Sequence, residues 1–203
     1  MAGVPLLLDA MSAFGAIATD MGVLGLTAVA ASSNKCLQGV PGIGLVICDR
    51  QALLATPTAP SLALDLAAQE AGFAASGEWR FTPPTHVVAA LAEALAELGD
   101  EGGPEARLAR YTANRDRLIA GMRGRGFRPI LAPGLQAPVI VTFAMPEDRP
   151  GFAFGPFYDA LKSEGYVIYP GKLARIDSFR IGCIGAVAPG DIDGFLSAVD
   201  RVL

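Results

Sequence analysis

Short, uninterrupted runs of apolar residues mark the first 50 positions of the chain. They cover residues 4–8, 27–31 and 44–48, and the first two end at the polar residues Asp9 and Ser32. Continuous apolar runs of this length are typical of strands that are buried on both faces, as in parallel sheets. The pattern therefore predicts a mostly parallel α/β domain at the start of the chain.

Helical periodicity replaces these runs in the middle of the chain. Residues 62–75 are rich in alanine, and residues 87–98 repeat apolar side chains at helical spacing with glutamates on one side. Two glycines then precede Pro104, which suits the first turn of a helix over 105–123. We expect the arginines of that helix to be solvated, namely Arg107, Arg110, Arg115 and Arg117.

The last part of the chain alternates short strands with helices. The predicted elements are strands over 139–143, 166–169 and 179–182 and helices over 157–164 and 191–203. This order favours a smaller α+β unit. We therefore expect two domains, with residues 1–103 forming the α/β domain and residues 104–203 the α+β domain.

Composition excludes several classes of protein. Hydrophobic residues make up 52% of the chain and charged residues 18%, which excludes disorder. The longest apolar run, 21–31, is shorter than the about 20 residues that a membrane-spanning helix needs. The net charge of −4, without a basic stripe, argues against a nucleic-acid partner. No basic segment of a signal peptide is visible, and three cysteines without metal-binding spacing suit a reducing cytoplasm.

Asp9 and Lys35 are the first candidates for chemistry, because each follows the end of a predicted strand. Ligands of open α/β sheets bind in the crevice beyond the carboxyl ends of the strands. A lysine amine and a carboxylate in one crevice are the pair that pyridoxal phosphate requires. The alternative is that Asp9 caps a loop and Lys35 is solvated.

The glycine-rich residues 39–44 lack the glycine spacing of dinucleotide-binding motifs and precede a strand, so they favour a tight loop.

Thr82 and Arg180 are weaker candidates. Thr82 followed by Pro83 predicts a helix N-cap, whose free N–H groups are either a phosphate site or an ordinary cap. Arg180 lies inside the apolar run 179–182, where burial of a guanidinium is costly unless it meets an anion. It either binds a carboxylate or phosphonate, forms an internal ion pair, or reaches water from an edge strand.

Six segments, in this order, resemble those of one enzyme family. They are LLLDAMSAFG (6–15), SSNKCLQGVPGIG (32–44), LALDLAAQ (62–69), GEWRFTPPTH (77–86), GYVIYPGK (165–172) and FRIGCIG (179–185). Together they resemble the 2-aminoethylphosphonate–pyruvate transaminases, class V aminotransferases of pyridoxal-phosphate fold type I. The resemblance implies the C-terminal part of the large, mostly parallel α/β domain, followed by the small α+β C-terminal domain.

The resemblance also implies roles for six residues. They are Lys35 as the Schiff-base lysine, Asp9 as the acid on the pyridine nitrogen, Met11 against the cofactor ring, Asn34 and Thr82 near its phosphate, and Arg180 on the substrate anion. Thr82 is expected to reach the other subunit of a homodimer with a shared active site. The implied reaction moves the amino group of 2-aminoethylphosphonate to pyruvate, which gives phosphonoacetaldehyde and L-alanine.

Other functions stay open at this point. They are another class V enzyme such as an alanine–glyoxylate transaminase, a truncated non-catalytic remnant without the N-terminal cofactor-binding half, and a plain nucleotide-binding module. A cysteine desulfurase is disfavoured, because Cys36 adjoins the lysine and Cys48 lies in a predicted strand. Cys183 and Ala67 depart from the polar and aromatic residues that the resemblance leads us to expect, which affects the expected substrate preference.

The resemblance covers nearly all of this chain but only somewhat more than half of a typical family member. The remaining part of such a member carries the glycine-rich phosphate loop, an aromatic residue on the cofactor ring and further strands of the sheet. We therefore expect an apolar edge and face of the sheet to be exposed in this chain, which favours association.

Overall fold

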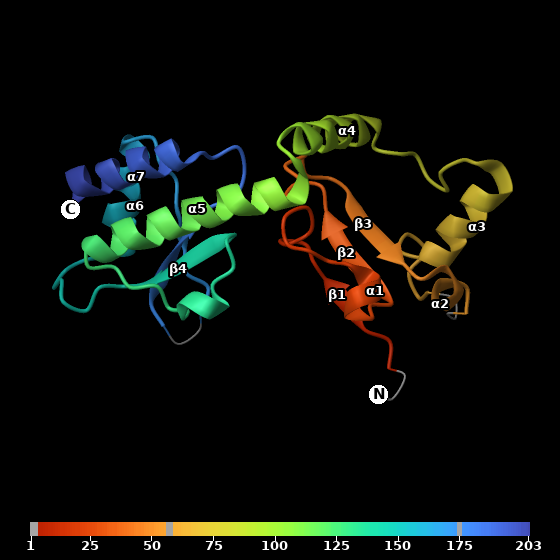
Figure 1. Ribbon diagram of the computed structural model, residues 1–203, viewed down its shortest axis with the longest axis horizontal. Coiled ribbons are helices and arrows are strands. Elements are labelled where there is room, and N and C mark those ends of the chain that lie inside the picture. The colour runs from red at the N-terminus through yellow and green to blue at the C-terminus, as the bar shows by residue number, and fades with distance from the viewer. Residues whose placement is uncertain (1–3, 56–58, 174–175) are drawn as a thin grey trace. The chain divides into compact units, whose positions relative to one another are not determined.

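The computed structural model describes residues 4–55, 59–173 and 176–203. The chain divides into two compact units, Met1–Glu101 and Gly102–Leu203 (Figure 1). Each unit has its own three-stranded sheet within the described residues. No helix in this described part of the chain is both long and apolar enough to cross a membrane.

The sheet of the first unit has the order β1 (Leu7–Asp9), β2 (Ala28–Ser32), β3 (Gly44–Cys48). Strands β1 and β2 are parallel, as predicted, and β3 is antiparallel to β2, which the parallel prediction did not include. The reason is the connection over 33–43, a loop without a helix. A parallel neighbour needs a longer crossover, usually helical, to return the chain to the same edge.

The apolar side chains of this sheet are largely exposed. Leu7 of β1 is 69% exposed and Ile47 of β3 is 48% exposed, whereas Val29 of the central strand is buried. The prediction that all three strands are buried on both faces is therefore wrong for the outer two. The exposed apolar edge and face that the sequence predicts are confirmed.

The helices of the first unit are α1 (Met21–Leu24), α2 (Arg50–Leu54), α3 (Leu66–Ser76) and α4 (Thr85–Asp100). The first three are each capped by an aspartate, Asp20, Asp49 and Asp65, whose carboxylate accepts from a backbone N–H three residues ahead. Asp65 explains why α3 begins later than the predicted residue 62. The short helices α1 and α2 were not predicted.

Helix α4 begins at Thr85, so the prediction that Thr82 caps it is wrong. Pro84 occupies the N-cap position, and no side chain caps the helix. The physical reason is the pair Pro83-Pro84, because a residue that precedes proline is pushed out of the helical conformation. Pro83 therefore cannot open the helix, which starts only after the second proline.

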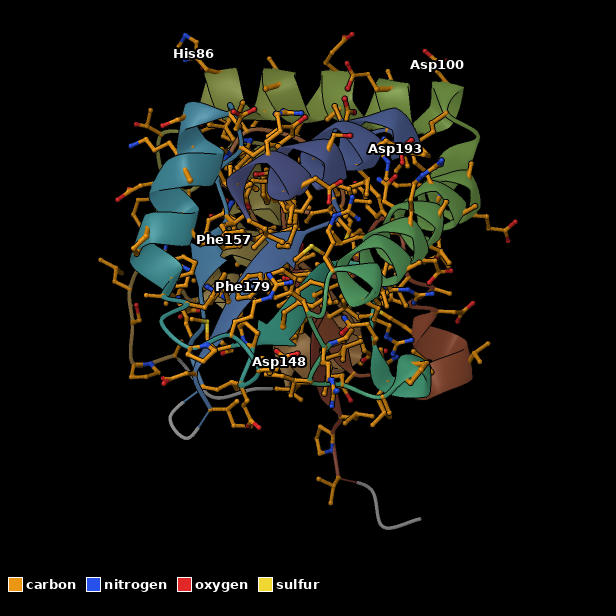
Figure 2. All side chains as sticks on the ribbon, turned by 90° about the vertical axis from the view of Figure 1, so that its left-hand side faces the viewer. His86, Asp100, Asp148, Phe157, Phe179 and Asp193 are labelled. Carbon is orange, nitrogen blue, oxygen red and sulfur yellow. The ribbon has the colours of Figure 1, made fainter. Side chains whose placement is uncertain are left out.

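In its described residues, the second unit contains three α-helices and a three-stranded sheet. Its elements are α5 (Gly103–Gly124), η1 (Pro133–Leu135), β4 (Ile140–Ala144), α6 (Phe154–Ser163), β5 (Tyr169–Pro170), β6 (Ser178–Gly182) and α7 (Pro189–Val202). The antiparallel sheet has the order β4-β6-β5. Phe179 of β6 and Phe157 of α6 meet in the core with their ring centroids 5.7 Å apart (Figure 2).

The prediction that the α5 arginines are solvated is wrong for part of the set. Arg107 is only 1% exposed, and Arg110 donates to the carbonyls of Gly185 and Val187. Arg117 is exposed and pairs with Asp193. The Arg110 guanidinium is drawn to the neighbouring loop because the backbone carbonyls of Gly185 and Val187 need donors and arginine supplies five.

Close packing between α5 and α7 gives a stability prediction. A Cβ added at Gly121 would overlap the Leu196 side chain, whereas one added at Gly124, on the same helix, meets nothing within 4 Å. We expect Gly121→Ala to lower the free energy of unfolding by about 1–3 kcal/mol, the usual cost of overpacking. Gly124→Ala is the matched control and should not destabilise. Chemical denaturation of both variants measures this, and equal stabilities would contradict the packing described.

Candidate active site

The edge of the first sheet brings Asp9 and Lys35 to the same place. Asp9 is the last residue of β1 and lies opposite Ala30 of β2 in a parallel pair. Lys35 lies three residues beyond the end of β2. Because the carboxyl ends of parallel neighbours meet at one edge, the carboxylate and the amine lie in adjacent loops.

Direct hydrogen bonds join the two loops. The Ser32 hydroxyl donates to the carbonyl of Met11 over 3.5 Å, and the Cys36 thiol donates to the carbonyl of Ser12 over 3.3 Å. Within the Asp9 loop, the Met11 N–H donates to Asp9 Oδ1 over 2.9 Å. The Lys35 loop is therefore fixed against the loop that carries Asp9 and Met11.

Hydrogen bonds within the Lys35 loop, and packing against α4, also hold this loop in place. Ser33 is fully buried, and its hydroxyl donates to the carbonyl of Val40 over 2.6 Å. The Gly39 N–H donates to the carbonyl of Ser33 over 2.8 Å. Leu37 packs against Leu91 and Leu98 of α4. Sequence reasoning missed the roles of Ser33 and Cys36, because both side chains bond to backbone carbonyls and no spacing rule marks such residues.

The side chains of Asp9, Met11, Asn34 and Lys35 are all exposed at this edge. Within the described ranges, neither Asp9 nor Lys35 forms an ion pair, so both groups are open to a ligand. Pyridoxal phosphate needs an amine for its aldehyde and a carboxylate for its ring nitrogen. The residues present fit this cofactor. No cluster of His, Cys, Asp or Glu in the described part of the chain could hold a metal ion.

The other two predicted residues do not belong to these two loops. Thr82 is exposed in the segment before α4, and no hydrogen bond joins it to Lys35 among the described residues. Arg180 belongs to the second unit, in the middle strand of its sheet, so the edge-strand alternative is wrong. Its Nε donates to the carbonyl of Pro170 over 3.0 Å, and no carboxylate in the described residues pairs with it.

Burial limits the reactivity of two of the three cysteines. Cys36 and Cys183 are buried, and Cys48 is half-buried. Burial raises the pKa of Cys183 to about 12, with the nearby Arg115 acting in the opposite direction. A thiol with this pKa stays protonated at neutral pH, and the thiolate is the reactive form. The sequence-based argument against a cysteine desulfurase therefore gains support from burial.

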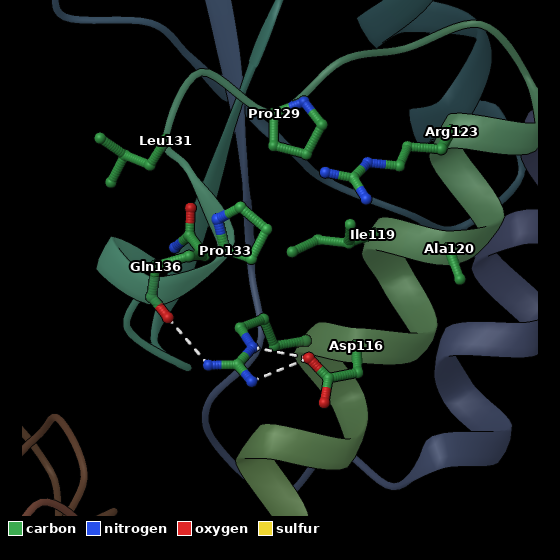
Figure 3. Close-up of a pocket in the computed structure, with 9 residues that line it drawn as sticks. Asp116, Ile119, Ala120, Arg123, Pro129, Leu131, Pro133 and Gln136 are labelled. Carbon is green, nitrogen blue, oxygen red and sulfur yellow. Dashed lines mark hydrogen bonds and ion pairs between the residues drawn. The ribbon is translucent and has the colours of Figure 1, made fainter.

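A pocket of about 240 Å³ lies in the second unit between α5 and the segment 129–136 (Figure 3). Its charged lining residues are Arg115, Asp116 and Arg123, and the Arg115 guanidinium is already bonded to Asp116 and to the carbonyl of Gln136. The pocket offers no amine for a carbonyl substrate, and none of the six candidate residues lines it. We therefore do not take it as the candidate active site.

Curated relatives match almost the whole chain. A protein of Burkholderia ambifaria (strain MC40-6) called 2-aminoethylphosphonate–pyruvate transaminase is 49% identical over 202 residues, which are 99% of this chain and 54% of that protein. A protein of the same description from Pseudomonas putida (strain W619) is 47% identical and is covered over 55% of its length. The chain thus spans about half the length of the curated relatives it matches.

Solved structures and a family model agree with this likeness. Pyridoxamine–pyruvate aminotransferase from Mesorhizobium loti superposes with a TM-score of 0.87 at 24% identity, over 98% of this chain and 52% of that one. Alanine–glyoxylate aminotransferase from a Nostoc species gives 0.86 at 20% identity, over 98% and 54%. At these identities both show the fold alone, the predicted α/β fold of the aminotransferases. The aminotransferase class-V model matches residues 1–150. The chain therefore belongs to the class V aminotransferase family.

Proposed function

We propose that this chain carries the cofactor lysine of an aminotransferase that moves the amino group of 2-aminoethylphosphonate to pyruvate. The products are phosphonoacetaldehyde and L-alanine, so the reaction is a step of phosphonate breakdown. The observation that carries the proposal is the juxtaposition of Asp9 and Lys35 at adjacent strand ends. It is supported by the relatives of that name, which are 47–49% identical over 202 residues.

The cofactor roles follow from the chemistry of the side chains. Pyridoxal phosphate, when bound, supplies an electron sink that the protein lacks. The exposed Lys35 amine would hold it and would move a proton as acid and base. The Asp9 carboxylate would keep its ring nitrogen protonated, and the Met11 N–H, which donates to Asp9 Oδ1, would fix that carboxylate in place. Met11 would pack on the ring, and Asn34 would contribute to the phosphate site.

We assign binding of the substrate anion to the second unit. Arg180 binds the anionic end of the substrate, because a guanidinium matches two oxygens of a carboxylate or phosphonate with two N–H groups. In this proposal residues 1–103 form part of the large cofactor-binding domain, and residues 104–203 form the small domain. In a cytoplasmic homodimer, Thr82 would help to hold the cofactor phosphate of the other subunit.

A comparison of two pairs of amino donor and acceptor tests this function. The purified chain, with pyridoxal phosphate, is given 2-aminoethylphosphonate and pyruvate in one reaction and L-alanine and glyoxylate in another. We expect phosphonoacetaldehyde only in the first, and faster turnover there. Faster alanine–glyoxylate transfer would favour the other class V activity. A folded chain, verified by circular dichroism, that catalyses neither reaction would favour the non-catalytic remnant.

A further inference from the structure

The sheet of the second unit sets Arg180 in a row of three side chains. Arg180 of β6 lies directly opposite Thr142 of β4 and Tyr169 of β5. Residues directly opposite each other in antiparallel strands place their side chains on the same face. The neighbours of Arg180 along β6, Phe179 and Ile181, are buried in the core. The row therefore lies on the face of the sheet that points away from the helices.

Two contacts hold the Arg180 guanidinium on this face. Its Nε donates to the carbonyl of Pro170 over 3.0 Å, and its Cζ lies 6.0 Å from the centroid of the Tyr169 ring. Nη1 and Nη2 have no hydrogen-bond partner within the described residues. Because only Nε is used in a hydrogen bond, the N–H groups of Nη1 and Nη2 are available to donate to an anion with two oxygens.

The support for these contacts is itself held rigidly. The Gly171 N–H donates to the carbonyl of Ser178 over 2.8 Å, directly beyond β5. A Cβ added at Gly171 would overlap the backbone of Ser178, so only glycine permits this approach of the two strands. The backbone that carries Tyr169 and Pro170 is thereby fixed against β6.

We infer that Tyr169 is a positioning residue for the substrate anion, acting through Arg180 together with the Pro170 carbonyl. A long arginine side chain in water samples many rotamers, and an anion must order it on binding. The ring below the guanidinium and the carbonyl at Nε hold it in one orientation beforehand, which lowers that cost. This inference rests on the proposed role of Arg180 as the anion site.

The test titrates the chain with methylphosphonate and with pyruvate and follows the Nε–H signal of Arg180 by NMR. Tyr169→Ala removes the ring, Tyr169→Phe keeps it, and Val167→Ala is a matched control that removes an exposed side chain from the same segment. We expect Tyr169→Ala to weaken anion affinity about two- to fivefold and to speed exchange of the Nε–H with water. The other two variants should match the unsubstituted chain. In the transaminase assay the same loss should raise KM and leave kcat unchanged.

Two failures are distinguishable. If Arg180 responds to anions with the same affinity and exchange rate in Tyr169→Ala as in the unsubstituted chain, the positioning role of Tyr169 is overturned and Arg180 keeps its role. If the Arg180 signal does not respond to either anion in the unsubstituted chain, the proposed role of Arg180 is overturned, and the inference falls with it.

Discussion

Replacing Lys35 with alanine is expected to abolish both amino transfer and the visible absorbance of covalently bound pyridoxal phosphate. The amine is the only group in the loop that can attach to the aldehyde of the cofactor, since its neighbours Asn34 and Cys36 offer an amide and a buried thiol. Loss of a positioned acid–base group alone lowers rates by about 10²–10⁴-fold, and loss of the covalent link adds to this. Spectrophotometry of the purified variants with added cofactor measures the effect.

Lys172→Ala is the matched control, because Lys172 is also exposed and lies in the second unit. It should retain the absorbance band. A band of normal intensity in Lys35→Ala would show that another amine holds the cofactor.

Asp9→Asn is expected to keep the cofactor attached but to lower the rate of amino transfer by about 10²–10³-fold, the usual cost of losing a preorganised electrostatic group. Asparagine retains an oxygen that can accept the Met11 N–H, so the loop should stay folded. It removes the negative charge that, in the proposed function, keeps the ring nitrogen protonated. Rate measurements at saturating substrate, with cofactor content determined in parallel, separate these two effects.

Asp20→Asn provides the control for a change of charge. Asp20 likewise accepts from a backbone N–H, at the start of α1, and an amide can still cap that helix. Its transfer rate should equal that of the unsubstituted chain. If Asp9→Asn lost no more activity than Asp20→Asn, Asp9 would have no part in the chemistry.

The sequence was informative where one physical rule decides the outcome. Apolar runs that stop at Asp9 and Ser32 identify two strand ends, and the parallel pairing of β1 and β2 brings their loops together. The helices over α4 and α5 follow from periodicity and from the Gly102-Gly103-Pro104 break. These features depend on local composition, which a single sequence contains.

Features that depend on tertiary partners were out of reach. The antiparallel pairing of β3 depends on how the chain returns through 33–43, and apolar content alone does not reveal it. The burial of Arg107 could not be predicted from its helix alone, and the carbonyls that Arg110 binds come from a distant part of the chain. The N-cap of α4 also differs from the prediction. Pro84 occupies this position, so the helix starts after Thr82.

The environment of Arg180 depends both on its local sequence and on its tertiary partners. Because Arg180 is a charged residue in an apolar run, the sequence left three alternative roles open for it. The alternation of side chains along β6 decides between these roles only once the core face of the sheet is known. Phe179 and Ile181 face the core, so Arg180 faces away from it. Its position on the face away from the core is therefore a consequence of strand geometry, and the contact with Pro170 required the pairing of β5 with β6.

The most direct measurement maps the attachment site of the cofactor. The chain is incubated with pyridoxal phosphate, reduced with borohydride to make the link permanent, digested and analysed by mass spectrometry. The sequence has three lysines, Lys35, Lys162 and Lys172. The account predicts that the modified peptide contains Lys35, at close to one cofactor per chain. A modification spread over the three lysines, or confined to Lys162 or Lys172, would contradict it.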